Sequence, residues 1–359
     1  STDTGINLLE PGETPYENAQ FLLFLVAVIK AIDEYQDLLR VSAASAGNDH
    51  RLGANEAPPA IISMFLGEEL TEILEAIEAG TAYKSKEKIE MEIGVSALPH
   101  FHKDTTDRNR TSPFAFTGNK FEFRMLGSAF SISGPNIVLN TVVAEILSQF
   151  ADKLEKSSDF KGDLAKLVKN TFHEHKRIVF NGNNYSEEWV VEAEKRGLLN
   201  MKTTVDALPK FTSAHSIEVF TKHGVFTEGE IHSRYEILLD GYYKTINIEA
   251  LTMVSMVKSS FIPACLAYQS ELACLMERKN KCGEFDNSLE SHLLDKISKL
   301  SSCMLKRLTA LENVLLEASK DNVFTSMSEL RLVVDELETL VAKKHWPFPS
   351  YAEILYSVV

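Results

Sequence analysis

The sequence is poor in cysteine and has no long apolar run. Its four cysteines, at positions 265, 274, 282 and 303, form no Cys-x-x-Cys pair, so neither a zinc site nor a disulfide scaffold is indicated. We interpret them as free thiols in a reducing cytoplasm. The longest apolar run, Phe21 to Ile29, has nine residues, whereas a membrane-spanning helix needs about 20. We therefore expect a cytoplasmic protein with no membrane partner.

Basic residues are in deficit. Lys and Arg number 37 against 51 Asp and Glu, which gives a net charge of −14. A surface that binds nucleic acid or an anionic membrane needs an excess of cations, so we expect no nucleic-acid partner. No basic segment precedes a short apolar stretch at the start, as a secretory signal would require. Neither of the two common glycine-rich phosphate-binding motifs is present.

The rest of the composition is that of an ordinary globular protein. Of the 359 residues, 44% are apolar and 25% are charged, which argues against disorder of the whole chain. The length suggests two or three domains. Strand signals are confined to the first part and helix signals dominate after residue 155, so we expect an α+β fold that is mostly helical.

Helix and strand signals are mixed in the first part. Thr14 and Glu17 have the spacing of a capping box, so they predict a helix that extends to about Arg40. Residues 43–59 are expected to form a loop because they contain several Gly and Pro breakers. The other elements expected here are a helix over 68–79 that Gly80 ends, a strand over 88–95, an irregular segment over 103–119, a strand over 120–125 and a helix over 134–150.

Helices are predicted throughout the remainder. One is capped by Ser186 and ends at Gly197, and another begins at the capping box of Thr227 and Glu230 and extends to about Lys244. Three long helices are expected over 247–279, 287–318 and 325–344. In the second of these, apolar residues recur at steps of three and four, which predicts an antiparallel bundle. These residues are Leu293, Ile297, Leu300, Met304, Leu308, Leu311 and Leu315.

The polar segment over 103–124 contains the most informative chemistry. Side chains alternate between the two faces of a strand, so Lys120, Glu122 and Arg124 are expected to share one face. A carboxylate between two cations can form a solvated row of ion pairs. It can also form a floor that binds an anionic substrate with its cations and a metal with its carboxylate. The strand alone leaves both interpretations open.

Two more guanidinium groups, Arg108 and Arg110, lie just upstream. Several cations near a carboxylate suit phosphoryl transfer, where positioning and charge neutralisation supply most of the catalysis. We interpret Arg108 as a residue that closes a loop through a salt bridge. The segment over 47–59 has a charged centre between glycines and a rigid Pro-Pro end. It is either a mobile lid that places Arg51 and Glu56 over a site or an ordinary turn with solvated charges.

At these residues the sequence resembles the glutamine synthetase family. Residues 51–58, RLGANEAP, resemble the glutamate-flap segment of that family. Residues 109–111, Asn-Arg-Thr, resemble its Asn-Arg-Ser motif, and residues 120–124, KFEFR, resemble its Arg-x-Glu-x-Arg strand. The sequences of these segments, and of GVFTEGEIHSRYEILL at residues 224–239, resemble those of the long type III branch of the family. The order of the three motifs makes the resemblance specific.

The resemblance implies a ligase that makes glutamine from glutamate, ammonia and ATP with Mg²⁺ or Mn²⁺, through a γ-glutamyl phosphate. By that resemblance Glu122 is a metal ligand, and Arg110 stabilises charge on the transferring phosphoryl group and contacts ATP. Arg124 then contacts the phosphoryl group or the glutamyl phosphate. Lys120 matches a family arginine near the nucleotide phosphates, where a lysine keeps the charge but loses the planar fork.

Two further roles follow from the resemblance. Arg51 is expected to hold the substrate carboxylate, and Glu56 is expected to close over the site and accept a proton from ammonium. One departure concerns Ala115, which stands where many members have a second arginine. The family also implies a homo-oligomer, a double-ring dodecamer in its type III branch.

The resemblance also gives expectations for the division of the chain. Residues 1–155 are expected to be the C-terminal half of the catalytic domain, 156–245 a helical extension of it, and 246–359 a helical bundle with a tail. The family's other metal ligands are expected before Ser1. Because one carboxylate cannot hold clustered Mg²⁺ ions, we expect the chain alone to be inactive. Two alternatives stay open: a non-catalytic assembly or regulatory paralogue, and a γ-glutamyl-amine ligase with another acceptor.

Overall fold

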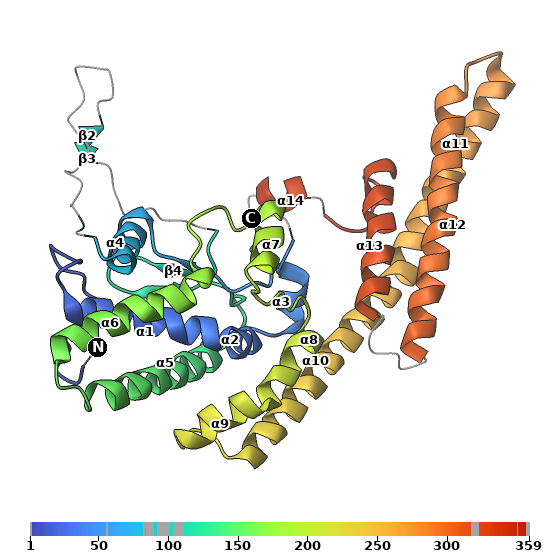
Figure 1. The fold of residues 1–359 in the computed structure, drawn as a ribbon. Coiled ribbons are helices and arrows are strands. Elements are labelled where there is room, and N and C mark those ends of the chain that lie inside the picture. Colours follow the sequence, from blue (N-terminus) through green and yellow to red (C-terminus); the bar gives the residue numbers. More distant parts are fainter. Residues whose placement is uncertain are drawn as a thin grey trace. The chain divides into compact units, whose positions relative to one another are not determined.

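The computed structural model describes residues 2–54, 57–81, 83, 90–91, 101–102, 111–316, 323–349 and 351–356. The chain forms two compact units, Ser1–Leu239 and Asp240–Val359. Helices dominate both units, and the first unit also contains a small mixed sheet (Figure 1). The expected α+β, mostly helical fold is therefore confirmed. The division into three domains at residues 155 and 245 stays a prediction.

The first unit contains five short strands and a larger set of helices among its described residues. Its strands are β1 (Met64–Phe65), β2 (Glu90–Met91), β3 (Phe101–His102), β4 (Phe114–Phe116) and β5 (Phe121–Phe123). Its helices up to residue 175 are α1 (Ala19–Glu34), α2 (Gln36–Ser42), α3 (Ala46–Arg51), α4 (Glu68–Ala79), α5 (Ser133–Leu154) and α6 (Phe160–His175). The later ones are η1 (Lys176–Ile178), α7 (Glu187–Lys195), α8 (Thr204–Ala207), η2 (Leu208–Thr212), α9 (Ala214–Lys222) and the start of α10 (Glu228–Met256).

The main sheet has the strand order β1-β4-β5. Strand β1 pairs in parallel with β4, and β4 pairs antiparallel with β5 in a register that places Ala115 opposite Glu122. The hairpin closes where the Thr117 N–H donates to the Lys120 carbonyl at 2.8 Å. Gly118 lies in this turn with a φ of +91°, a conformation that residues with a Cβ rarely adopt. A second, two-stranded sheet pairs β2 with β3.

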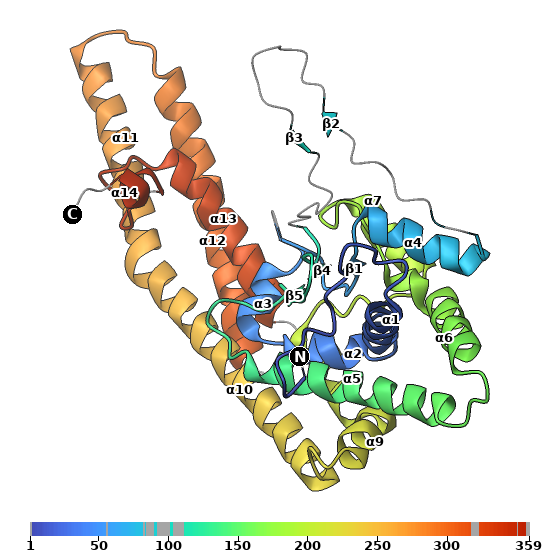
Figure 2. The ribbon, with the colours of Figure 1, turned by 90° about the vertical axis from the view of Figure 1, so that its left-hand side faces the viewer.

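Helix α1 forms the centre of the core of the first unit. It packs against α5 and α6, as both ribbon views show (Figures 1 and 2). Its apolar residues cover most of its circumference, and accordingly ten of its 16 residues are buried. Side chains of β1, β4, α4 and α7 complete the same apolar cluster.

The start of α1 differs from the prediction. The residue that caps the helix is Asn18, whose side chain accepts a hydrogen bond from the Phe21 N–H at 3.0 Å. Thr14 and Glu17 form only a preceding turn, closed by the bond from the Glu17 N–H to the Thr14 carbonyl. The expected single helix to Arg40 is also interrupted at Tyr35, after which α2 begins.

Two segments expected to be irregular contain regular structure. Residues 46–51, expected in a loop, form helix α3, because the Ser45 side chain caps it by accepting from the Asn48 N–H at 3.2 Å. Residues 114–116, expected in an irregular segment, form β4, because both β1 and β5 pair with them. The helix over 68–79 with Gly80 as its C-cap, and the Ser186 cap of α7, are confirmed.

The second unit is helical. It continues α10 and contains the π-helical turn η3 (Val257–Phe261), α11 (Ile262–Cys282), α12 (Ser288–Leu316), α13 (Val323–Leu340) and α14 (Tyr351–Tyr356). The helix predicted to end near Lys244 in fact continues to Cys282 through η3, because the sequence there contains no breaker before Pro263, which the first turn of α11 accommodates.

The apolar stripe of α12 packs as predicted. Ile297, Met304, Leu308 and Leu311 are buried, and the helix lies against α11 and α13. After α13, Trp346 and Phe348 contact Phe261 with ring centroids 5.0 and 5.2 Å away.

One helical run within the described residues, Glu228–Cys282, is long and apolar enough to cross a membrane by length and composition alone. Its most apolar 18-residue window has a mean hydropathy of 1.5, and 22% of that window is buried inside the protein. The shorter apolar runs counted in the sequence did not reveal this helix, because its apolar residues are separated by polar ones. Core helices of soluble proteins also pass this test, so a single such helix is weak evidence for a membrane span.

Candidate active site

The candidate site lies on the polar face of β5. Phe121 and Phe123 turn to the other face and pack against Phe114, with ring centroids 5.0 and 6.2 Å away. Met125, the next residue with the same alternation, is fully buried. This apolar anchoring leaves the side chains of Lys120, Glu122 and Arg124 exposed by 66%, 40% and 27%, so they are accessible to a ligand.

The Glu122 carboxylate is the centre of this face. One oxygen accepts from Arg124, with Nη2 at 2.9 Å and Nε at 3.2 Å. The other accepts from the Thr117 hydroxyl at 3.2 Å, and Lys120 Nζ lies 4.0 Å from it. The hydrogen bonds from Arg124 outweigh partial burial and lower the pKa of Glu122. The carboxylate is therefore ionised at neutral pH, as a metal ligand must be.

Arg51, the last residue of helix α3, reaches the backbone directly after β5. Its Nη1 donates to the Met125 carbonyl at 2.8 Å, and its Nη2 donates to the Arg124 carbonyl at 3.3 Å. Nη1 also lies 3.5 Å from Asn48 Oδ1. A guanidinium has five N–H donors, so these contacts leave part of its capacity for a ligand. The structure thus places Arg51 against the backbone of residues 124 and 125, and its role toward a substrate stays a prediction.

Helix α3 is fixed by polar groups that the sequence analysis did not single out. Asn48 is buried, and its amide donates to the carbonyls of Ala43 at 2.7 Å and Met125 at 3.0 Å. Asp49 accepts from both the N–H and the hydroxyl of Thr204, each at 2.8 Å. Arg40 Nη2 lies 3.7 Å from the same carboxylate. Asn48 and Asp49 gave no sequence signal because their partners lie about 75 and 155 residues away in the chain.

Glu56 and Arg110, which we expected to be catalytic, lie outside the described residues, and so does Arg108. The structure does describe their neighbours. The Gly53 N–H donates to the Pro58 carbonyl at 2.9 Å, so the two ends of the segment that contains Glu56 lie together. Thr111, directly after Arg110, accepts from the Asn184 N–H at 3.0 Å.

Glu122 is the metal ligand that the resemblance predicts in this chain. Within the described ranges, no group of three or more His, Cys, Asp or Glu side chains could hold a metal ion. The exposed, ionised carboxylate of Glu122 fits one ligand position of a Mg²⁺ or Mn²⁺ site, which needs further oxygen ligands.

Two buried carboxylates elsewhere in the first unit hold helices together. Asp33, on α1, accepts from His175 Nδ1 and from Arg177 Nε, each at 2.8 Å. Glu145, on α5, accepts from Lys222 Nζ at 2.8 Å and from His223 Nε2 at 2.7 Å. Both carboxylates are buried, so these pairs fix the packing of helices and are not open to substrate.

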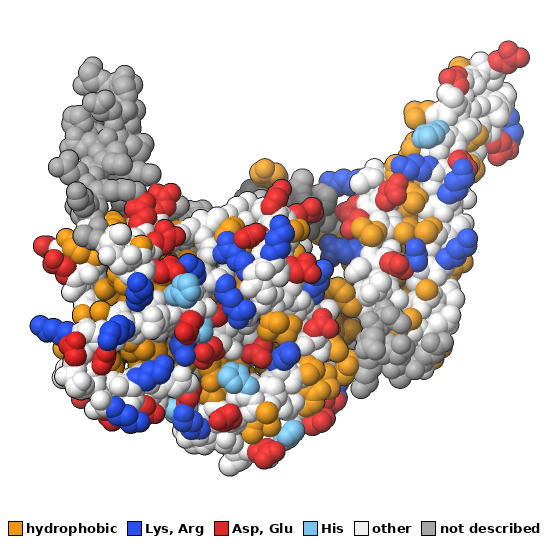
Figure 3. All heavy atoms as spheres, in the orientation of Figure 1, with side chains coloured by type: hydrophobic (Ala, Val, Ile, Leu, Met, Phe, Trp, Pro, Cys, Tyr) orange, Lys and Arg blue, Asp and Glu red, His pale blue; other side chains and the backbone are white. Residues whose placement is uncertain are grey.

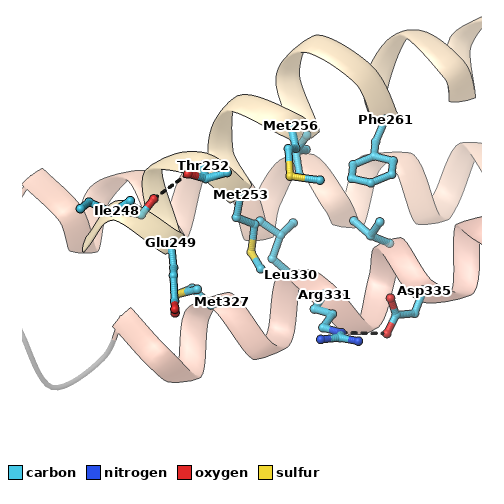
Figure 4. Close-up of a pocket in the computed structure, with 12 residues that line it drawn as sticks. Ile248, Glu249, Thr252, Met253, Met256, Phe261, Met327, Leu330, Arg331 and Asp335 are labelled. Carbon is cyan, nitrogen blue, oxygen red and sulfur yellow. Dashed lines mark hydrogen bonds and ion pairs between the residues drawn. The ribbon is translucent and has the colours of Figure 1, made fainter. Parts of the chain in front are cut away.

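The second unit contains a cavity of about 380 Å³ between α10 and α13. Met253, Met256 and Phe261 line it from one helix and Met327 and Leu330 from the other (Figure 4). Its charged residues lie at the edge, where Arg331 Nε is 3.3 Å from Asp335 Oδ2. This lining is mostly apolar, with Glu249, Arg331 and Asp335 as its charged residues, so we do not treat it as a second candidate active site.

Comparison with known proteins shows which proteins this chain is similar to. Residues 163–280 match the glutamine synthetase C-terminal domain. The chain is 45% identical to "Glutamine synthetase" of Butyrivibrio fibrisolvens, 42% identical to "Type-3 glutamine synthetase" of Dictyostelium discoideum and 36% identical to "Glutamine synthetase" of Bacteroides fragilis (strain YCH46). Each alignment covers 99% of this chain, and 53%, 51% and 52% of the respective relative.

The chain is therefore similar over almost its whole length to glutamine synthetases, and its residues 163–280 match the C-terminal domain of that family. One of these relatives is a type-3 enzyme, so the resemblance predicted from the sequence is confirmed. The chain spans about half the length of the curated relatives that it matches.

Proposed function

We propose that this chain forms part of an ATP-dependent ligase that makes glutamine from glutamate and ammonia through a γ-glutamyl phosphate. The observation that carries the proposal is the accessible, ionised Glu122 between Arg124 and Lys120 on β5, in a chain similar to glutamine synthetases over 99% of its length. We also propose that the protein is a cytoplasmic homo-oligomer.

Glu122 is the residue of this chain that we propose binds the divalent cation, Mg²⁺ or Mn²⁺. When bound, the cation neutralises charge on the phosphate of ATP and on the glutamate carboxylate. Arg124 supports Glu122 in two ways. Its hydrogen bonds hold the carboxylate in place, and they lower the pKa of Glu122, so the ligand stays deprotonated near neutral pH.

The cations around Glu122 are proposed to bind the anionic groups of the reactants. Arg124 contacts the transferring phosphoryl group or the glutamyl phosphate, and Lys120 lies toward the nucleotide phosphates. Arg110 contacts ATP and stabilises the charge that develops in the transition state. These roles agree with the accessibility of Lys120 and Arg124, the two of these residues that the structure describes.

Arg51 and Glu56 are proposed to act on glutamate and ammonia. Arg51 is fixed by the backbone of residues 124 and 125 and directs its remaining donors to the substrate carboxylate. Glu56 accepts the proton that ammonium must lose before its nitrogen attacks the acyl phosphate. Both roles come from the resemblance, and the docking of Arg51 on β5 supports the first.

The test of the proposal is a metal titration of glutamine formation in the protein that contains this chain. We expect Glu122→Ala to lower kcat by orders of magnitude and to raise the Mg²⁺ concentration needed for half-maximal rate. Glu122→Asp keeps the charge and should retain more activity. The control is Glu284→Ala, which removes an exposed carboxylate of the second unit. A Glu122→Ala enzyme with unchanged metal dependence would reject the ligand role.

Two further measurements address the alternatives. Comparing ammonia with polyamines as acceptors separates a glutamine synthetase from a γ-glutamyl-amine ligase, and we expect ammonia to be preferred. The inactivity of the chain alone stays a prediction. Glutamine formation by the purified chain, supplied with glutamate, ATP, Mg²⁺ and ammonia, would contradict it.

A further inference from the structure

The first unit contains a cavity of about 320 Å³ whose lining includes no residue of the β5 site. It lies where the end of α2 and the start of α5 meet η2, α9 and the start of α10. Its volume is that of small-molecule sites, which are typically apolar pockets with a few polar groups at defined positions. The function proposed above does not use this cavity.

Phenyl rings form the inner wall of the cavity. Phe211, Phe220 and Phe226 follow one another, with ring centroids 5.8 Å apart for the first pair and 5.1 Å for the second. Phe220 is fully buried and Phe211 is 7% exposed, so this wall is part of the core and is already formed. Such a surface binds an apolar or aromatic body.

The mouth of the cavity is polar and carries one cation. The Arg234 guanidinium lies over the ring of Phe226, with Cζ 4.4 Å from its centroid. The hydroxyls of Ser131 and Ser133, 2.9 Å apart, also line the cavity. Among the lining residues, Arg234 alone is charged. Glu230 lies one helical turn away, and its carboxylate is bonded to the N–H and hydroxyl of Thr227.

We propose that this cavity binds a small monocarboxylate with an apolar body of about the size of a phenyl ring. The apolar body would pack against the phenyl wall. The carboxylate would lie at the mouth, where the guanidinium offers a planar pair of N–H donors. The serine pair offers one more, from the hydroxyl that does not donate to its neighbour. Because no lining residue is acidic, a cationic head group would find no counter-charge here, which favours the anion.

The surface around the mouth supports a ligand with an apolar part. Ile237 and Leu238, on α10, line the cavity and are 66% and 41% exposed. Figure 3 shows apolar side chains gathered over this part of α10 on the face in view. A bound apolar body would cover part of this surface and remove it from water, which is favourable in proportion to the area covered.

The experiment uses phenylacetate as the probe and phenylacetamide as its neutral counterpart of the same size. Saturation-transfer NMR with the full chain measures the dissociation constant of each. We expect saturable binding of phenylacetate and at least tenfold weaker binding of phenylacetamide, the loss expected for a charge-assisted hydrogen-bonded pair. Equal affinity for the two compounds, or no saturable binding, would overturn the proposal.

Four variants locate the binding. Arg234→Gln, at an exposed position, should weaken phenylacetate about tenfold and leave phenylacetamide unchanged. Ala44→Phe fills the cavity and should abolish binding of both probes. Arg278→Gln, an exposed arginine outside the cavity, should have no effect. Binding that is lost in Arg124→Gln and unchanged in Arg234→Gln would place the carboxylate in the β5 site and reject this cavity.

Discussion

Single buried hydrogen bonds hold the residues next to the candidate site in place. Ser63 and Asn184 are fully buried, and the Ser63 hydroxyl donates to Asn184 Oδ1 at 2.6 Å. The Asn184 N–H in turn donates to the Thr111 hydroxyl at 3.0 Å. Because Thr111 directly follows Arg110 in the sequence, we expect this chain of bonds to matter for the proposed catalytic arginine, which itself lies outside the described residues.

Thr111→Val keeps the shape of the side chain but removes the hydroxyl that accepts from the Asn184 N–H. A buried N–H without a partner costs about 1–3 kcal/mol. If that cost falls on the transition state, kcat should be lowered about 10- to 100-fold, which is our prediction. Thr111→Ser keeps the hydroxyl and should retain most of the activity. Steady-state kinetics with varied ATP and glutamate would measure both. Equal rates for the two variants would show that the hydroxyl does not position Arg110.

The sequence predicted the residues of β5 better than those that support them. Strict alternation placed Lys120, Glu122 and Arg124 on one face, and their contacts follow from local geometry. Asn48 supports the same site through a bond to Met125, which is 77 residues away in the chain. Nothing in the local pattern specifies a partner so distant, so tertiary structure was needed to find it.

At the scale of elements, the start of α1 distinguishes two possible caps. The structure places the cap at Asn18, and Thr14 is exposed in the preceding turn. We predict that Asn18→Ala lowers the free energy of unfolding by about 1 kcal/mol, because the Phe21 N–H loses its acceptor. Thr14→Ala should change it by less than about 0.5 kcal/mol. Urea denaturation measures both. A larger loss of unfolding free energy in Thr14→Ala than in Asn18→Ala would identify Thr14 as the cap, as predicted from the sequence.

Glu145 links α5 to α9 in a way that depends on pH. Burial raises the pKa of its carboxyl, but hydrogen bonds from Gln149, Lys222 and His223 outweigh this and lower the pKa from 4.5 to about 2. A carboxyl with a lowered folded-state pKa stabilises the protein above its unfolded pKa. This stabilisation, at most about 3 kcal/mol, is lost as pH falls from about 5 toward 2.

We predict that Glu145→Gln is less stable than the parent at pH 7 and that the difference shrinks as the pH is lowered to 3. Urea denaturation at several pH values would measure this. Glu155→Gln, an exposed glutamate at the end of the same helix, is the matched control and should leave the pH profile unchanged. A constant difference across the pH range would contradict the proposed ionic link.

The errors in the predicted elements share one physical cause: hydrogen bonds formed in the folded chain outweigh the local sequence pattern. Residues 46–51 contain Gly47, which a local pattern treats as a breaker, but the Ser45 cap and the buried bonds of Asn48 make a short helix favourable. Residues 114–116 form a strand because β1 and β5 supply partners on both sides. The long amphipathic helix α12 was predicted well, because its own repeat of apolar residues determines which face is buried.

At the scale of the whole molecule, the helical run Glu228–Cys282 has apolar residues that no other part of the described chain covers. Leu251 is 52% exposed and Leu266 is 60% exposed, and the most apolar window of this helix is 22% buried. Exposed apolar surface of this kind is typical of contacts between proteins. It is the physical reason to place part of the proposed homo-oligomer contact on this helix.

We predict that the double variant Leu251→Glu, Leu266→Glu shifts the protein to smaller assemblies, because two carboxylates buried in a contact without partners cost several kcal/mol. Sedimentation velocity over a range of concentrations measures the shift. Ser255→Glu, Ser270→Glu adds the same charge at exposed polar positions of the same helix run and should leave the assembly unchanged. If both double variants assemble like the parent, the apolar residues of this helix lie outside the contact.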